Sequence, residues 1–131
     1  MSWHLPVADV ETQPFWDAAR EGRLLIKRCN GCSRAFFYPR AACPRCWSTD
    51  TSWIDASGRG TVYTFTVIHQ NDVPPFKDRV PYTVAIIDLE EGVRMTANVE
   101  GDVACGMGVS VAFREESADE ATLGIPFFRQ A

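Results

Sequence analysis

The chain has 131 residues, of which 46% are hydrophobic and 23% charged, and its net charge is −4. These values fit one soluble globular domain, or two small modules that share a core, and no stretch reaches the about 18 apolar residues that span a bilayer. The first residues lack the character of a signal peptide, so we expect a cytoplasmic protein with reduced cysteines and no membrane contact.

A short amphipathic helix is predicted over residues 12–22, with Thr12 as its N-cap and Gly22 as its end. Two adjacent aromatic residues, Phe15 and Trp16, lie on its apolar side. So short a helix does not bury both alone. They either pack on neighbouring elements or form a docking surface for a partner chain, which makes them candidate interface residues.

Two cysteine pairs follow, Cys29-Asn-Gly-Cys32 and Cys43-Pro-Arg-Cys46, separated by ten residues. Each Cys-x-x-Cys turn directs two thiolates at one centre, and zinc prefers four such soft ligands in a tetrahedron. A redox dithiol or two disulfides is the alternative, which two pairs so close together disfavour. We therefore predict a zinc ribbon over residues 23–48 that holds one structural Zn²⁺ with no open coordination position.

The ribbon region is basic although the whole chain is acidic. Residues 20–46 hold seven basic residues against Glu21 alone, a net charge of +6, which leaves −10 for the rest of the chain. Four thiolates and one Zn²⁺ together carry a charge of about −2, so part of this excess balances the metal centre. The surplus either faces a polyanion or forms a solvated rim.

From Trp53 onward the sequence is rich in β-branched and aromatic residues with a period near two. We predict five strands, at 53–56, 61–69, 82–89, 93–99 and 109–115. No predicted helix between them is long enough for a crossover, which indicates a small antiparallel barrel of the OB-fold type. The predicted fold class is therefore α+β and mainly β: an N-terminal helical segment (1–22), a zinc ribbon (23–48) and an OB-fold domain (49–131).

One connection is long. Residues 70–81 form a twelve-residue loop with prolines at 74, 75 and 81 and an aromatic residue, Phe76, between them. Loops of this length in compact domains are often functional. We expect Phe76 either to reach a partner or to fold back onto the barrel. Many exposed aromatic residues would indicate obligate pairing, and we expect five of them on the surface: Phe15, Trp16, Phe76, Phe127 and Phe128.

Several motifs follow one another in a recognisable order: Phe15-Trp16, Cys29-x-x-Cys32, Phe37-x-Pro39-Arg40, Cys43-Pro44-x-Cys46, Ser-Gly-Arg-Gly-Thr-Val-Tyr-Thr-Phe-Thr at 57–66, Pro81-Tyr82-x-Val84-Ala85 and Leu-Glu-Glu-Gly at 89–92. Together they resemble the acyl-CoA-associated family that joins a rubredoxin-like zinc ribbon to an OB-fold, long described as a domain of unknown function. The resemblance covers nearly all of residues 11–129.

The resemblance implies a non-catalytic accessory subunit. Such subunits bind thiolase-like enzymes, including thiolases and the aldolases that shorten steroid side chains, or pair with hot-dog-fold enoyl-CoA hydratases. They stabilise the catalytic chain and help to hold its CoA ester, in lipid or steroid breakdown.

Coenzyme A offers phosphates, an adenine ring and a thin pantetheine arm. Arginines donate forked hydrogen bonds to phosphates, and aromatic rings stack on the base. The candidate CoA-binding residues are Arg34, Phe37, Tyr38, Arg40 and Arg59. The alternatives are a place in the hairpin core for the aromatic residues and a rim charge for Arg59.

Independent catalysis is not expected. Outside the zinc set there are one cysteine, Cys105, and two histidines, His4 and His69, without a recognisable nucleophile motif. Cys105 fits a small hydrophobic role, and His69 could reach a partner's active site. A zinc ribbon joined to an OB-fold is also used by single-stranded nucleic-acid binders, but the acidic barrel half argues against that class.

Overall fold

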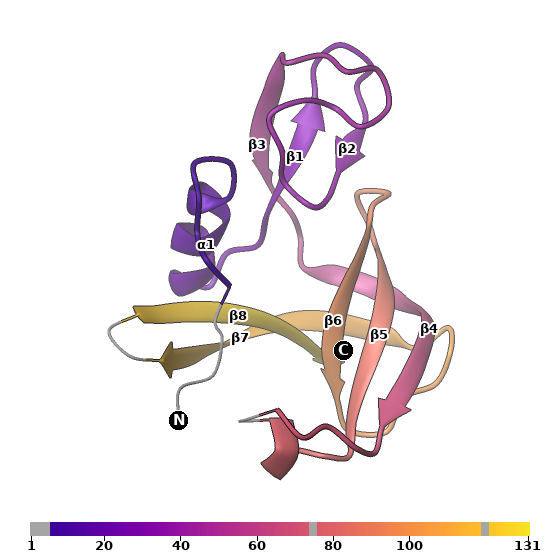
Figure 1. Ribbon diagram of the computed structural model, residues 1–131. Coiled ribbons are helices and arrows are strands. Elements are labelled where there is room, and N and C mark those ends of the chain that lie inside the picture. Colours follow the sequence, from indigo (N-terminus) through magenta and orange to yellow (C-terminus); the bar gives the residue numbers. More distant parts are fainter. Residues whose placement is uncertain (1–5, 74–75, 119–120) are drawn as a thin grey trace.

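The computed structural model describes residues 6–73, 76–118 and 121–131, and within them the chain forms one α-helix, a small sheet and a closed barrel (Figure 1). The small sheet stands above the barrel in Figure 1, and the helix lies beside both. The predicted class, mainly β with one short helix, is confirmed. Among the described helices none is long and apolar enough to cross a membrane.

Helix α1 (Gln13–Arg20) is slightly shorter than predicted. Thr12 occupies the N-cap position, but its hydroxyl accepts the Asp9 N–H at 3.1 Å instead of capping the helix. Gly22 follows the helix with φ +78°, and its N–H donates to the Ala19 carbonyl at 3.1 Å. A left-handed glycine thus ends the helix, as the sequence indicated.

The expectation of exposed aromatic residues is wrong for four of the five. Phe15 and Trp16 are 2% and 6% exposed, and Phe127 and Phe128 are 8% and 0% exposed. The reason is that α1 packs on the last strand of the barrel, which the sequence analysis did not predict. Phe15 and Trp16 therefore belong to the core and do not offer a free docking surface.

The ribbon sheet consists of β1 (Leu25–Cys29), β2 (Ala35–Phe36) and β3 (Thr51–Asp55), in the order β2-β1-β3 and fully antiparallel. The prediction that the strand near Trp53 belongs to the barrel is wrong. Trp53 lies opposite Lys27 of β1, and the Lys27 ammonium sits 4.8 Å from its ring centroid.

The barrel closes in the order β4-β5-β6-β8-β7, with a parallel pair between β6 and β8. This connectivity confirms the OB-fold. Its fifth strand is β8 near the C-terminus, in place of the predicted strand at 53–56. The bounds are β4 (Arg59–Ile68), β5 (Tyr82–Leu89), β6 (Arg94–Glu100), β7 (Gly108–Ala118) and β8 (Ala121–Gln130).

One hydrophobic core joins the three parts of the chain. Inward-facing residues of the barrel, such as Ile87 and Phe128, pack in the same cluster as Phe15 of α1 and Ile26 of β1. All four are at most 2% exposed. The ribbon is therefore anchored to the barrel through shared packing, while the division into separate domains stays a prediction.

The long loop folds back toward the barrel. It contains a 3₁₀ turn, η1 (Phe76–Asp78), and the half-buried Phe76 ring lies 5.9 Å from the ring of Tyr82. The Tyr82 hydroxyl accepts a hydrogen bond from Asn71 at 2.9 Å. The prolines at 74 and 75 lie outside the described residues.

Candidate metal centre and ligand groove

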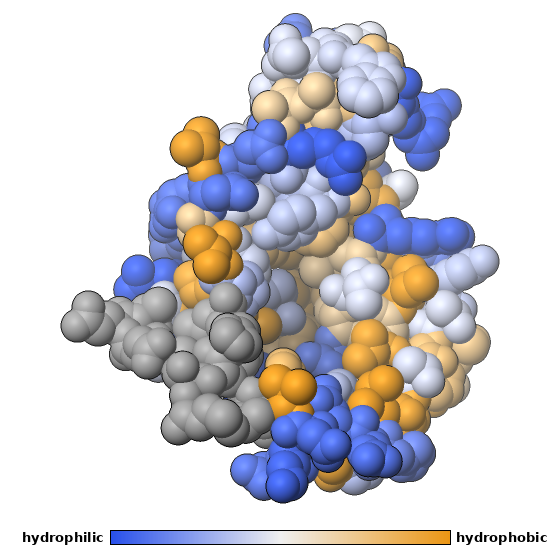
Figure 2. All heavy atoms as spheres, viewed as in Figure 1, coloured by the Kyte–Doolittle hydropathy of each residue, from blue (hydrophilic) through white to orange (hydrophobic). Residues whose placement is uncertain are grey.

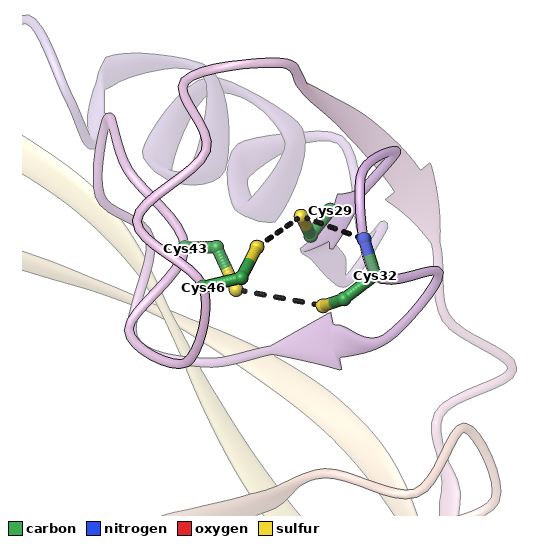
Figure 3. Close-up of side chains that lie close together, drawn as sticks. All are labelled: Cys29, Cys32, Cys43 and Cys46. Atoms are coloured by element: carbon green, nitrogen blue, oxygen red, sulfur yellow. Dashed lines mark hydrogen bonds between the residues drawn. The ribbon is translucent and has the colours of Figure 1, made fainter.

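The two Cys-x-x-Cys turns bring four sulfur atoms together between β1 and β2 and the loop that follows (Figure 3). All four Sγ atoms lie within 4.8 Å of one another, with Cys29 and Cys46 at 3.4 Å and Cys32 and Cys43 at 3.8 Å. Sulfur atoms bound tetrahedrally at about 2.3 Å from zinc are about 3.8 Å apart. The donor set therefore fits Zn²⁺.

Backbone N–H groups favour the thiolate form of two of these sulfurs, those of Cys29 and Cys43. The Cys32 N–H donates to the Cys29 sulfur at 3.4 Å and is the main cause of the lowered pKa of Cys29. Backbone N–H donation from Cys46, and then from Arg45, lowers the pKa of Cys43 to about 6. Because the thiolate is the form that binds metal, this ribbon holds one structural zinc ion, as predicted.

Three cavities lie in series along β6. The first, of about 540 Å³, lies between the ribbon and the β5–β6 turn, and the second, of about 490 Å³, lies between α1 and β6. The third, of about 400 Å³, reaches the long loop. Phe37 and Arg94 line both the first and the second, and Asn98 lines both the second and the third. We call this series the β6 groove, and Figure 2 shows the surface hollowed between the helix and the barrel.

The middle of the β6 groove is aromatic. The Phe15 ring lies 5.6 Å from that of Phe37 and 6.1 Å from that of Tyr38, and edge-on to Trp16 at 4.8 Å. Tyr38 is 42% exposed, so part of its ring is open to solvent. Side chains from the ribbon and the helix thus form one apolar wall over the barrel strand.

The far end of the β6 groove contains two arginines. Arg79 and Arg114 both pair with the carboxylate of Glu116, at 2.9 and 3.1 Å. Arg45 lines the ribbon end. One wall of the groove is therefore apolar at its centre. Basic side chains lie at both ends, beside Asp88 at the ribbon end and Glu100 at the far end, and Arg45 could donate to an anionic group of an elongated ligand.

The structure brings only two of the five candidate CoA residues into this groove, Phe37 and Tyr38. Arg34 and Arg40 are exposed and line none of its three cavities. Arg59 lies elsewhere on the barrel, where its guanidinium donates to Glu90 at 2.9 and 3.1 Å and lowers the pKa of that carboxyl.

The glycines that flank Arg59 shape the barrel itself. A Cβ at Gly60 would lie 2.6 Å from the Asp88 carbonyl oxygen, and one at Gly58 would lie 2.4 Å from a methyl group of Val111. Barrel atoms fill the space that a ligand would need in order to contact these glycines. Both glycines are therefore explained by close packing within the barrel.

Five of the groove residues that the sequence analysis missed lie on β6. Arg94, Thr96 and Asn98 alternate with the apolar residues Met95 and Ala97, and all five line the second cavity. A polar row on one side of a predicted strand was the available signal. This signal did not reveal a groove, because the polar row borders a cavity only where β8 diverges from β6 and α1 approaches β6.

Comparison with known proteins places this architecture in a family. Family models for ChsH2 match its rubredoxin-like zinc ribbon domain at residues 16–52 and its C-terminal OB-fold domain at residues 53–114. The chain is 38% identical to a DUF35 domain-containing scaffold protein of Methanocaldococcus jannaschii, over 82% of each chain. It is 32% identical to the benzoylsuccinyl-CoA thiolase subunit BbsA of Geobacter metallireducens, over 74% of this chain and 59% of the relative.

A probable enoyl-CoA hydratase alpha subunit of Thermomonospora curvata is 36% identical over 89% of this chain, but the match spans only 37% of that relative's length. Among solved structures, a chain of the Ltp2-ChsH2(DUF35) aldolase superimposes with a TM-score of 0.78 and 33% identity, over 96% of this chain and 98% of that one. On these matches and on its zinc ribbon and OB-fold, the chain belongs to the ChsH2/DUF35 family.

Proposed function

We propose that this chain is a non-catalytic accessory subunit of a thiolase-like acyl-CoA enzyme, which it stabilises and whose CoA ester it helps to hold. The main support is the near-complete overlap, with a TM-score of 0.78, with a chain of the Ltp2-ChsH2(DUF35) aldolase. The likeness to a thiolase subunit points to the same class of partner.

The chemistry of this chain supports an assisting role. Four thiolates complete the coordination of a structural zinc ion, so the metal has no position left for a substrate. Cys105 and His69 are exposed side chains on separate segments, one in the β6–β7 loop and the other after β4. In this role the partner supplies the nucleophile or the base.

The β6 groove supports the CoA-holding part of the proposal. The seven residues of β6 extend over about 20 Å, a distance suited to an elongated ligand. Phe37 and Tyr38 offer aromatic faces, and Arg45 at the ribbon end, which forms no ion pair within the described residues, offers donors for phosphates. A CoA ester combines these features: anionic groups, a ring and a thin arm.

A hydratase partner is the second candidate. It is favoured by the hydratase alpha subunit that matches 89% of this chain. The match covers about a third of that relative's length.

Isolation of the tagged chain from its native host is expected to recover a thiolase-like chain in a fixed ratio, identified by mass spectrometry. Recovery of a hot-dog-fold hydratase chain would favour the second candidate. If only nucleic acid is recovered, with salt-sensitive retention, or if the chain alone turns over a thioester, the accessory-subunit proposal is wrong.

Blocking the groove is expected to weaken CoA binding by the isolated complex. Thr96 is exposed and lines the second cavity, so Thr96→Trp would fill its centre without disturbing the core. Titration of the complex with acetyl-CoA should show an affinity that is reduced by about tenfold or more. Thr66→Trp is the matched control, since Thr66 is an exposed strand threonine that lines none of the three cavities. Equal affinities in both variants would remove the groove from the proposal.

A further inference from the structure

The second zinc knuckle ends on an exposed tryptophan. Trp47 follows Cys46, is 79% exposed and belongs to neither hydrophobic cluster. Its φ is +65°, a left-handed conformation that bulky residues avoid and glycine adopts freely. Burial therefore gives no reason for a tryptophan at this position, and the left-handed backbone conformation favours glycine.

The metal centre holds this tryptophan on a rigid base. The Trp47 N–H donates to the Cys43 carbonyl at 2.9 Å, and both Cys43 and Cys46 belong to the zinc set. The residue that follows, Ser48, lies against the first knuckle, where its Cβ is 3.2 Å from the Cβ position of Gly31. A side chain on a fixed backbone loses little conformational freedom on binding, which favours affinity.

Arginines around the ribbon differ from those of the barrel. In the barrel, Arg59, Arg79, Arg94 and Arg114 pair with carboxylates. Arg23 at the start of the ribbon also pairs, with Asp55 at 3.3 Å. Four other exposed ribbon arginines form no ion pair within the described part of the chain: Arg28, Arg34, Arg40 and Arg45. Exposed tryptophan and arginine side chains are the residue types most often found in interface hot spots.

Arg34 and Trp47 flank the same metal centre. The Arg34 carbonyl accepts the Cys29 N–H at 2.8 Å, which places Arg34 on the first knuckle, as Trp47 is on the second. We call these two residues the knuckle surface. Arg45 also lines the β6 groove and is therefore left out of this definition.

We propose that the knuckle surface docks into an apolar pocket with an acidic rim on the partner subunit. The inference rests on the proposed function, since it names where the partner binds. Charge complementarity indicates an acidic protein surface, because the +6 of the ribbon side chains exceeds the charge of about −2 on the metal centre. A nucleic acid is disfavoured, because the rest of this chain carries −10 and would repel an extended polyanion.

The test measures the affinity between this chain and the purified partner subunit by surface immobilisation. Trp47→Gly is expected to weaken binding about tenfold or more, with zinc content and thermal midpoint retained because glycine accepts the left-handed φ. Arg34→Glu should weaken binding similarly and reduce its dependence on salt. Val10→Gly and Arg20→Glu are matched controls at exposed positions away from the knuckles, and we expect wild-type affinity from both.

The outcomes separate two failures. A partner that binds both knuckle variants with wild-type affinity overturns this inference and leaves the accessory role intact. Failure to find any catalytic partner overturns both. If the two changes abolish retention of a single-stranded oligothymidylate probe by the free chain, the surface serves nucleic acid and the proposal is wrong.

Discussion

Replacement of Cys43 by serine is expected to abolish zinc binding and unfold the ribbon. Cys43 is 1% exposed, and its sulfur lies 3.8 Å from that of Cys32. A serine hydroxyl is a poor ligand for zinc, and the three remaining cysteines without a metal cannot replace its bonds. Structural zinc contributes about 10–16 kcal/mol in small zinc domains, which matches or exceeds the about 5–15 kcal/mol that stabilises a whole domain.

Elemental analysis should give one zinc per chain for the wild type and none for the variant, with a thermal midpoint far below that of the wild type. Cys105→Ser is the matched control, because Cys105 is an exposed cysteine outside the zinc set. It should retain the metal and the midpoint. A Cys43→Ser chain with stoichiometric zinc and an unchanged midpoint would contradict the tetrathiolate centre.

The loss should also reach the barrel. Leu24 and Ile26 come from the ribbon and its approach, and they are 3% and 0% exposed in the same core as Ile87 of β5. When the ribbon unfolds, these side chains lose their fixed positions and the barrel loses packing with them. We therefore expect the near-ultraviolet signal of the barrel aromatic residues to weaken on metal removal as well.

The zinc ligands could be predicted from the sequence because their information is local. Two Cys-x-x-Cys turns fix the ligand spacing within each pair, and Cys32 and Cys43 need only a short connection. The alternation in β5 is local in the same way, with Ala85, Ile87 and Leu89 buried and their neighbours partly exposed. Such features do not depend on which element lies alongside.

The errors arose where the neighbouring element in the fold, and not the local sequence, decides the structure. The residues near Trp53 have the pattern of a strand, but this pattern does not indicate which of the two sheets the strand joins. Only the tertiary fold pairs Trp53 with Lys27. The β6 groove has the same origin, since β6 and β8 pair only at Val99 with Phe128 and at Glu100 with Arg129. No pattern in either strand indicates that they separate beyond this point.

Strand β8, which the sequence analysis did not predict, contains Gly124 and Pro126, two residue types that are uncommon within strands. Both lie within the strand: Gly124 pairs with Glu115, and Pro126 pairs with Phe113. The glycine has a physical reason. A Cβ at Gly124 would lie 2.6 Å from the Ala19 carbonyl oxygen, so the strand accepts the helix only where the side chain is absent.

Gly124→Ala is accordingly expected to lower the free energy of unfolding by about 3 kcal/mol. The added methyl group would also lie 2.7 Å from the Ala19 carbonyl carbon and 2.9 Å from the Arg20 nitrogen. These are backbone atoms that cannot turn aside, so α1 must move. Phe15 and Trp16 then lose part of their packing. The measurement is chemical denaturation followed by circular dichroism.

Gly108→Ala is the matched control, because Gly108 lies in β7 with nothing within 4 Å of its Cβ position and needs no left-handed φ. Its stability should stay near that of the wild type, and equal stability of the two variants would contradict the close approach of α1 to β8.

Gly124→Ala should keep its zinc, because the ligands lie on the ribbon. Since Phe15 and Trp16 also line the β6 groove, the same variant should bind acetyl-CoA more weakly in the complex. Retained zinc together with a lower affinity for acetyl-CoA would separate the role of the helix from that of the ribbon.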